Sequence, residues 1–583
     1  MRHTPGAHKV QFDQGMCIEW DVPIEMDDGV VLRCDLFRPM DDRPYPVILS
    51  QGPYAKWLHF GDGFPPQWKQ LSEQHPEVTS NSSCRYQNFE VADPERFVPD
   101  GYVVMRLDSR GTGRSPGFLD IWSAREAQDL YECIEWAAKQ SWSSGRVALS
   151  GISYLAMNQW QAAELEPPHL AAMIICEGAS DYYREMTHHG GILCTFSKIL
   201  YEPAIVAVQY GRGKRGPRSR MNGDWVCGPV TLSEEQLGAN RRDWHSDCIE
   251  NGLATDDFWT SRLPDFKKIK IPFLSMANWG GQGLHLRGNI EGFLEAASED
   301  KWLEIHGRQH WVEYYTDYGV ELQKRFLGHF LKDEDTGWQK QPRVQILVRY
   351  PGDRYVERHE HEWPLARTQW TKLFLDGSSY GLARDPVPLR SSVTYRGFSD
   401  GATFLTQPLA EDTEITGPIA VKLFISSETN DADFFIVVRA FSHDFKELTF
   451  QGHIDPHTTI AQGWLRASHR RLDSERSLPY RPYHTHDEIQ PLKQGEIYEL
   501  DIEVWPTCVV VPKGHRLALS IRGKDYAYPG DPVGSHQGAF TGVGAFRHDE
   551  PSDRPPDIFD RNVTLHCGSD HQAYVLLPVI PAA

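Results

Sequence analysis

Short apolar runs alternate with helical patterns over the first half of the chain. Six segments have the composition of buried strands, namely PVILS (46–50), YVVMRLD (102–108), RVALSGIS (146–153), LAAMIICEG (170–178), IPFLSMANW (271–279) and KWLEIHG (301–307). Few polar positions alternate within them, which favours burial on both faces. Residues 125–140 place Ala127, Leu130, Ile134 and Ala138 on one helical face. This pattern predicts an α/β fold with a mostly parallel sheet and helices on both sides.

Two changes in this rhythm divide the chain. Residues 181–268 are rich in Tyr, His and Arg and separate two predicted strands, which predicts a helical cap inserted over the carboxyl ends of the sheet. After about residue 335 the helical patterns become few, and strand-like segments such as VQILVRY, TKLFLDG and FFIVVRAF follow one another. We therefore expect an α/β core over 1–180 and 269–335, a cap over 181–268 and a β-sandwich over 336–583. A chain of 583 residues is long enough for several domains.

Composition excludes some partners. The chain has 60 Lys and Arg against 80 Asp and Glu, a net charge of −20, which argues against a nucleic acid or an anionic membrane as partner. The first 15 residues contain no apolar leader, and no uninterrupted apolar stretch is long enough to span a membrane. The ten cysteines form no CxxC pair. We expect a cytoplasmic protein with free thiols and no structural metal.

Ser153 is the first candidate for chemistry. It follows an apolar strand and precedes a helical pattern, an arrangement that exposes a serine hydroxyl next to free backbone amides. Such a turn is crowded and needs small residues. Gly151 lies two positions before Ser153, whereas Leu155 and Ala156 lie two and three positions after it. The alternative is that Ser153 only caps the helix.

Several further motifs carry a family resemblance. The elbow reads Gly151-Ile152-Ser153-Tyr154-Leu155-Ala156, and upstream of it come Pro53-Tyr54, Gly101-Tyr102 and Asp108-Ser109-Arg110-Gly111 with Gly113-Arg114-Ser115. With these motifs the chain resembles the cocaine esterase and X-Pro dipeptidyl-peptidase family of α/β-hydrolases, the CocE/NonD type, whose elbow reads G-x-S-Y-x-G. The resemblance covers nearly the whole chain. It implies a hydrolase core, a helical cap and a C-terminal jelly-roll-like (galactose-binding-like) domain, and a serine hydrolase without metal or organic cofactor.

The resemblance also implies roles for single residues. Ser153 matches the nucleophile, and Tyr54 with the backbone amide of Tyr154 matches the oxyanion hole. His310, three positions after Gly307 and following the last predicted strand, matches the catalytic histidine, whereas His306 lies within the strand pattern and is expected to be structural. From the residues alone, Trp57, Tyr182 and Tyr183 are candidates for an apolar acyl pocket, although such aromatic residues can equally be packing.

The acid of the triad is missing from its family position. An Asp is expected shortly after Trp279, but Asn278-Trp279-Gly280-Gly281 places Gly281 there. The site is then inactive, or the histidine works alone, or the acid comes from another strand. We favour Glu177, because a charged residue at the end of the apolar run LAAMIICEG is unexpected unless it is paired. Asp181 and Asn278 are the alternatives.

Three functions remain open at this point. The first is a serine hydrolase that cleaves an ester or amide bond of a small acyl substrate through an acyl-enzyme. The second is an acyltransferase that gives the same acyl group to an amine or alcohol. The third is a catalytically silent relative that binds a partner or glycan through its β-sandwich. The family resemblance adds the expectation that the protein self-associates as a homo-oligomer.

Overall fold

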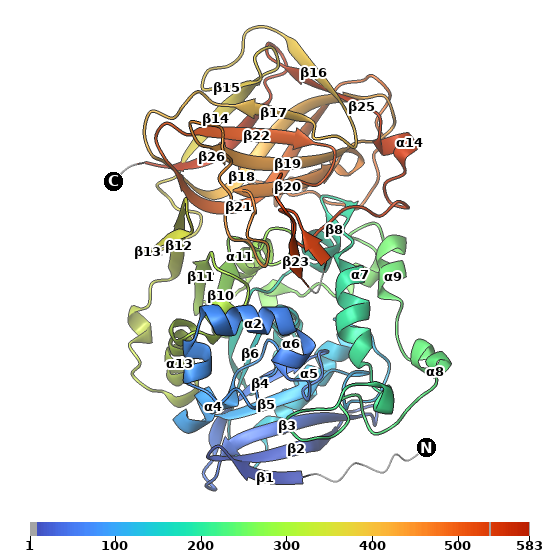
Figure 1. The fold of residues 1–583 in the computed structure, drawn as a ribbon, viewed down its shortest axis with the longest axis vertical. Helices are drawn as coiled ribbons and strands as arrows, with labels where there is room; N and C mark the ends of the chain where they lie inside the picture. The colour runs from blue at the N-terminus through green and yellow to red at the C-terminus, as the bar shows by residue number, and fades with distance from the viewer. Residues whose placement is uncertain (1–8, 536–537, 582–583) are drawn as a thin grey trace.

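The computed structural model describes residues 9–535 and 538–581 and shows an α/β part below a β-sandwich (Figure 1). The strands of the α/β part form one sheet, in which β5, β4, β6, β7, β10, β11 and β12 pair in parallel and β1, β2, β3 and β13 extend the two edges antiparallel. In spatial order they are β1 (Lys9–Asp13), β2 (Met16–Glu25), β3 (Val31–Pro39), β5 (Val103–Asp108), β4 (Tyr45–Gly52), β6 (Ser143–Ile152), β7 (Leu170–Cys176), β10 (Phe273–Asn278), β11 (Lys301–His306), β12 (Val344–Tyr350) and β13 (Arg354–Glu360). The expected mostly parallel α/β sheet is confirmed.

Helices cover both faces of this sheet. On one face, α5 (Ala124–Ala138), α6 (Tyr154–Glu164) and α11 (Leu286–Glu295) bury side chains such as Leu130 against strand residues such as Leu49. On the other face, α13 (Asp317–Lys332) buries Phe326 in the cluster that holds Ile48. The shorter helices of this part are α1 (Phe60–Gly63), α2 (Pro65–Gln74), α3 (Glu77–Ser80), α4 (Pro94–Phe97) and α12 (Val312–Tyr315).

The predicted cap segment consists of short elements. They include two π-helical turns (Tyr183–Thr187 and Tyr201–Ile205), a small hairpin of β8 (His188–His189) and β9 (Ile192–Leu193), and the helices α7 (Phe196–Leu200), α8 (Glu234–Ala239), α9 (Trp244–Glu250) and α10 (Asp257–Thr260). Helices α7 and α9 lie to the right of the sheet and below the β-sandwich in Figure 1. That residues 181–268 form a separate cap domain therefore stays a prediction.

The last part of the chain is rich in β-strands, as expected. Its main strands are β14 (Gln369–Asp376), β15 (Gly381–Ala383), β16 (Ser391–Arg396), β17 (Ala402–Leu405), β18 (Thr413–Ser427), β19 (Asp433–Phe441), β20 (Ala461–Arg466), β21 (Tyr498–Val511), β22 (Arg516–Arg522), β25 (Asn562–Cys567) and β26 (Tyr574–Ile580). Their inward side chains form one hydrophobic cluster that includes Leu423, Ile436 and Leu519. The segment VQILVRY differs from the expectation. As β12 it pairs in parallel with β11, so by hydrogen bonding it extends the α/β sheet.

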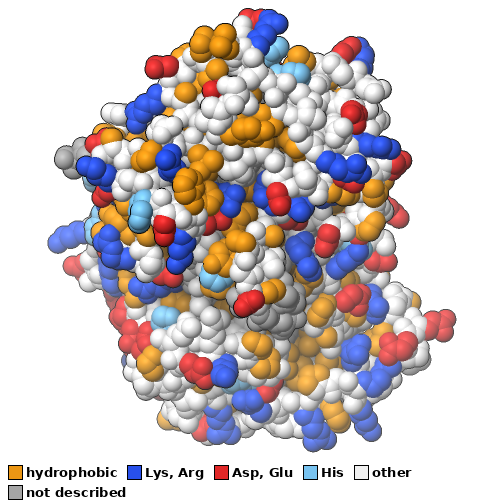
Figure 2. Space-filling model, turned by 45° about the horizontal axis from the view of Figure 1, so that its top comes forward, with side chains coloured by type: hydrophobic (Ala, Val, Ile, Leu, Met, Phe, Trp, Pro, Cys, Tyr) orange, Lys and Arg blue, Asp and Glu red, His pale blue; other side chains and the backbone are white. Residues whose placement is uncertain are grey.

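The surface shows no large field of one charge on the face seen in Figure 2, where Lys and Arg side chains are interspersed with Asp and Glu. Among the described residues, no helix is both long enough and apolar enough to cross a membrane.

Candidate active site

Ser153 occupies a strained backbone position between β6 and α6. Its φ of 55° and ψ of −116° lie in a region that non-glycine residues rarely adopt. Its side chain makes no capping hydrogen bond to the helix, so the capping alternative has no support in the geometry. The amide of Tyr154 begins α6, and the first amides of a helix have no partner within the helix. The turn thus presents a hydroxyl and a free amide at the same place.

Small residues make this turn sterically allowed. A side chain on Gly151 would place its Cβ 2.5 Å from Cβ of Leu155, which explains the glycine two positions before the serine. Ala156 stands where the resemblance leads us to expect glycine. Its Cβ would be 3.2 Å from a Cβ on residue 178, which is Gly178. The methyl group of Ala156 is accommodated because the neighbouring strand end carries a glycine.

Glu177 and His310 form a hydrogen-bonded pair. Glu177 follows β7 and His310 follows β11, and Oε2 of Glu177 lies 2.7 Å from Nδ1 of His310. Both side chains are buried. Glu177 has a positive φ of 44°, so its backbone too is held in an unfavourable conformation. Such strain collects where a structure must aim a side chain at a fixed point.

The other oxygen of Glu177 is held by two further groups. Nδ2 of Asn278 donates to Oε1 at 3.1 Å, and Nε2 of His306 lies 3.0 Å from the same oxygen. Nδ1 of His306 in turn lies 2.9 Å from Oε2 of Glu304. Asn278 therefore contacts Glu177 rather than the histidine. Asp181 lies elsewhere, in an ion pair with Arg184 at 3.0 Å.

The electrostatics of this group follow from burial and pairing. Burial by itself would raise the pKa of Glu177, but the charge of His310 and hydrogen bonds from both imidazoles hold that pKa well below its usual range. Burial lowers the pKa of His310, whereas the Glu177 charge raises it, and the result is a pKa of about 9. For His306, burial likewise lowers the pKa, but the charge of Glu304 and further contacts raise it, and the resulting pKa is about 10. At neutral pH the arrangement is an ion-paired one.

A second carboxylate, which the sequence analysis did not find, contacts the other side of His310. Oε1 of Glu90 lies 3.1 Å from Nε2 of His310, and the side chain is 2% exposed. Burial raises the pKa of Glu90, and the hydrogen bond and charge of His310 oppose that rise. Glu90 stands between Phe89 and Val91, so the argument that singled out Glu177, a charge within an apolar run, would have found it. In this structure the atom that a triad needs as a base is in contact with an acid.

Asp108 fixes the loop that places Tyr54 near Ser153 and His310. The Asp108 carboxylate accepts hydrogen bonds from the backbone amides of Lys56 at 2.6 Å and Arg114 at 2.8 Å. It thereby fixes the loop that carries Tyr54, whose neighbour Ala55 has a positive φ of 64°. The ring of Tyr54 packs edge-on against Tyr154, with centroids 6.0 Å apart. Burial raises the pKa of Tyr54 well above its usual value, so its hydroxyl remains a donor.

Glu126 anchors Tyr154 from the other side. The hydroxyl of Tyr154 donates to Oε2 of Glu126 at 2.6 Å, and the hydroxyl of Ser109 donates to Oε1 at 2.5 Å. Glu126 lies in the first turn of α5, where Oγ of Ser123 accepts a hydrogen bond from its amide. Burial raises the pKa of this carboxyl to about 7. The start of α6, which carries the candidate oxyanion amide, is thus tied to α5.

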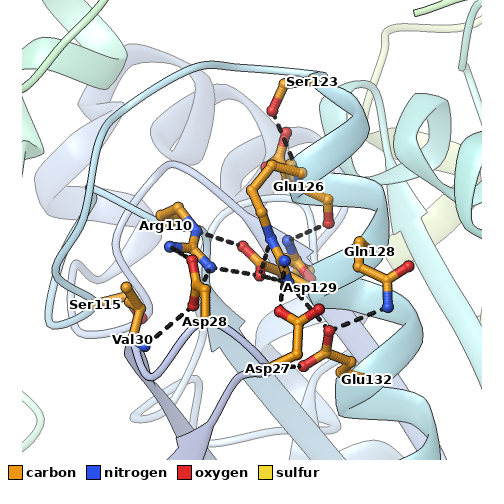
Figure 3. Close-up of polar contacts among 12 residues, drawn as sticks. Asp27, Asp28, Val30, Arg110, Ser115, Ser123, Glu126, Gln128, Asp129 and Glu132 are labelled. Atoms are coloured by element: carbon orange, nitrogen blue, oxygen red, sulfur yellow. Dashed lines mark hydrogen bonds and ion pairs between the residues drawn. The ribbon is translucent and has the colours of Figure 1, made fainter.

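Ion pairs of Arg110 hold the loop of the Asp108-Ser109-Arg110-Gly111 motif against α5. Figure 3 shows Arg110 between Asp28 and Asp129, with Asp27 and Glu132 alongside. Nε and Nη2 of Arg110 donate to the two oxygens of Asp129, each at 2.8 Å, and Nη1 donates to Asp28 at 2.8 Å. Asp129 is fully buried, so this bidentate pair is a strong one. These residues support the site without reaching it.

The candidate residues meet at a small cavity of about 30 Å³. It is lined by Tyr54, Phe64, Phe89, Glu90, Ser153, Phe196, Leu200, Leu284, His285, His310, Trp311, His453 and Ile454. The lining combines one nucleophile candidate, one base candidate and one hydroxyl donor with an aromatic wall. It includes residues of the cap segment and, through His453, of the C-terminal part.

The three aromatic residues expected to line an acyl pocket are not among those lining residues. The Trp57 indole donates to Asp35 at 2.9 Å, in a buried charged cluster below the Tyr54 loop. The Tyr182 hydroxyl donates to Gln161 at 3.0 Å, and the Tyr183 hydroxyl donates to the Gly252 carbonyl at 2.8 Å. Each has its polar group engaged elsewhere, and the structure places them in packing rather than at the cavity.

Known families and solved structures match nearly the whole chain. Residues 28–312 match the family model of X-Pro dipeptidyl-peptidase (S15 family), and residues 336–576 match that of the X-Pro dipeptidyl-peptidase C-terminal non-catalytic domain. A solved CocE/NonD family hydrolase from Staphylococcus aureus is 32% identical, with a TM-score of 0.82 over 97% of this chain and 94% of that one. Cocaine esterase from Rhodococcus sp. is 23% identical over 97% of this chain and 99% of its own length.

Proposed function

Since this chain belongs to the CocE/NonD family of hydrolases, we propose that it cleaves an ester or amide bond of a small acyl substrate with Ser153 as nucleophile, His310 as base and Glu177 as acid. The observation that carries this proposal is the contact of 2.7 Å between Glu177 and Nδ1 of His310, at a cavity that His310 shares with Ser153. A carboxylate at Nδ1 leaves Nε2 as the nitrogen that exchanges protons with the serine.

The reaction follows from these positions. Oγ of Ser153 attacks the substrate carbonyl while Nε2 of His310 takes its proton. The negative charge that develops on the carbonyl oxygen is stabilised by the Tyr54 hydroxyl and the Tyr154 amide, each worth about 3 kcal/mol in related sites. His310 then gives its proton to the leaving group, and an acyl group stays on Ser153. Water activated by the same imidazole releases the acid.

Glu177 replaces the acid that is absent after Trp279. Its carboxylate is oriented by Asn278 and His306, which occupy its second oxygen and leave Oε2 for His310. Gly280 supports the arrangement in another way, since a Cβ there would lie 2.5 Å from Cα of Gly452 in the C-terminal part. The chain segment after β10 therefore carries no acid and instead packs closely against the neighbouring domain.

Glu90 adds a gating step to this mechanism. Nε2 of His310 must leave its contact with Glu90 before it can accept the Ser153 proton. We propose that substrate entry separates the two groups, because an acyl group in the cavity occupies the space between them. The aromatic wall formed by Phe64, Phe89, Phe196 and Trp311 then holds the apolar part of the acyl group.

The proposal is tested by trapping the acyl-enzyme. Purified protein is mixed with p-nitrophenyl esters of increasing acyl length, and the burst of nitrophenol is followed by mass spectrometry of the acidified enzyme. We expect an acyl group on the peptide that contains Ser153, and no burst with Ser153→Ala. Turnover that persists in that variant would overturn the assignment of the nucleophile. Product analysis with an added amine separates hydrolysis from acyl transfer.

All ten cysteines are free and buried, which supports a reducing compartment, and we propose that the protein acts in the cytoplasm. Whether it acts as a homo-oligomer is decided by light scattering across a range of protein concentrations.

A further inference from the structure

Three histidines from separate parts of the chain converge beside Ser153. His285 precedes α11, His310 follows β11, and His453 lies between β19 and β20 in the C-terminal part. One ring nitrogen of each lies within 4.8 Å of the corresponding atoms of the other two. The rings of His310 and His453 have centroids 4.0 Å apart, and those of His285 and His310 have centroids 5.0 Å apart. All three line the same cavity as Ser153.

Hydrogen bonds on the far side of two of these rings decide which nitrogen faces the cavity. Because His310 is ion-paired at neutral pH, a metal ion binds its Nε2 by displacing the proton from that nitrogen. Nδ1 of His285 lies 3.3 Å from the carbonyl oxygen of Gly178, which can only accept, so Nδ1 carries the proton. Nε2 of His285 is then an unprotonated nitrogen, and it is buried without a hydrogen-bond partner among the described residues. Nδ1 of His310 is bound to Glu177 in the same manner. Ligand histidines in metal sites are oriented by such carbonyl or carboxylate partners.

The carboxylate of Glu90 is a fourth side chain that can bind a metal ion. Its Oε1 lies 3.1 Å from Nε2 of His310, and its buried carboxylate has Trp311 as a further polar neighbour. Three imidazoles and a carboxylate are a donor set that suits Zn²⁺ and neighbouring divalent transition metals. The charges of Glu90 and Glu177 together would balance a dipositive ion in this buried place.

One adjustment is needed for a single ion to bind. The rings of His285 and His310 are parallel to within 7°, and a metal lies in the plane of each ring that binds it. One ring must tilt by rotation about its χ2 angle. His285 is the ring expected to tilt, since its hydrogen bond to the Gly178 carbonyl is long.

We propose that this cavity is a binding site for a divalent transition-metal ion of the zinc class, held by His285, His310, His453 and Glu90. The bound ion occupies Nε2 of His310 and so inhibits the hydrolase reversibly. It also joins the α/β part to the C-terminal part through His453 and stabilises the protein against unfolding. The inhibition rests on the proposed function of His310, whereas the binding and the stabilisation do not.

The site is tested first by binding. Zn²⁺ is titrated into metal-free Ser153→Ala protein by calorimetry, and the thermal midpoint is followed with and without Zn²⁺. We expect one ion per chain and an upward shift of the midpoint. Co²⁺ in place of Zn²⁺ should give the visible absorption of a four-coordinate ion. The absence of stoichiometric binding would overturn the proposal, whether or not the wild-type protein hydrolyses esters.

Inhibition is tested with a matched pair of variants. His453→Ala removes one ligand, whereas His457→Ala changes a histidine of the same loop whose ring stacks on Tyr528. We expect the Zn²⁺ inhibition constant, measured against each variant's own uninhibited rate, to rise at least ~10-fold for His453→Ala and to stay unchanged for His457→Ala. If His453→Ala fails to fold, the Co²⁺ spectrum of the wild type still shows whether a four-coordinate ion binds. Equal inhibition constants in the two variants would place the ion elsewhere and overturn the assignment.

Discussion

Oε2 of Glu177 lies 2.7 Å from Nδ1 of His310, although 133 positions separate the two residues in the chain. The contact exists because β7 and β11 both flank β10 in a parallel sheet, so that their carboxyl ends lie on either side of one strand. The residue that follows β10 in the family position for the acid is not needed when the carboxylate comes from the next strand. Several predictions about activity and stability depend on this arrangement.

Glu90→Gln should shift the pH dependence of catalysis. The Glu90 hydrogen bond and charge help to raise the pKa of His310 to about 9, and the base is competent only when deprotonated. Removing the charge lowers that pKa. The ascending limb of kcat/KM against pH should therefore move to lower pH, measured with a chelator present. An unchanged limb would show that Glu90 does not contact the base in the working enzyme.

Tyr54→Phe should lower kcat while leaving the fold intact. The hydroxyl is proposed to donate to the oxyanion, and the loss of one such donor costs about 3 kcal/mol, or roughly 100-fold in rate. The ring remains to pack against Phe89 and Tyr154. Steady-state kinetics on one ester should show the loss mainly in kcat. A loss confined to KM would instead indicate that Tyr54 binds the ground state.

Gly151→Ala should damage both stability and activity. The added Cβ would meet Leu155 at 2.5 Å, so α6 and with it Ser153 must move, at a cost of about 1–3 kcal/mol. Gly238→Ala is the matched control, because Gly238 lies in α8 and no atom would be within 4 Å of the added Cβ. Denaturant unfolding compares the two. Equal stabilities would mean that the elbow is less crowded than the structure shows.

His306→Gln should destabilise the protein most at low and neutral pH. The pKa of His306 is raised from 6.5 to about 10, so its contribution is complete below pH 6.5 and is lost as the pH rises through 10. Removing the charged partner of two buried carboxylates costs about 3–5 kcal/mol. The difference in the free energy of unfolding between wild type and variant should shrink from pH 6 to pH 10. A difference that is constant with pH would show that His306 is neutral in the folded protein.

The sequence predicts the architecture of this site better than its details. Strand ends can be read from apolar runs, so Ser153 and Glu177 stand out as polar residues at such ends, and a parallel sheet brings these ends together. The roles of Ser153 and His310 were implied by the family resemblance. Glu90 was missed because it lies in an irregular loop rather than at the end of a predicted strand, although its apolar neighbours Phe89 and Val91 were a signal of burial. Trp57, Tyr182 and Tyr183 were expected at the cavity because aromatic residues near a nucleophile motif are ambiguous. Their burial is decided by long-range partners such as Asp35 and Gln161.

The most direct test of the account compares the rate of fluorophosphonate labelling at Ser153 in the wild type, Glu177→Gln and Asp181→Asn. Asp181 is the matched control, since it is a nearby acid paired with Arg184. We expect fast labelling of the wild type and of Asp181→Asn, and a rate at least ~1,000-fold lower in Glu177→Gln, as when a triad loses its acid. Labelling of Glu177→Gln at the wild-type rate would contradict the claim that Glu177 is the acid of this site.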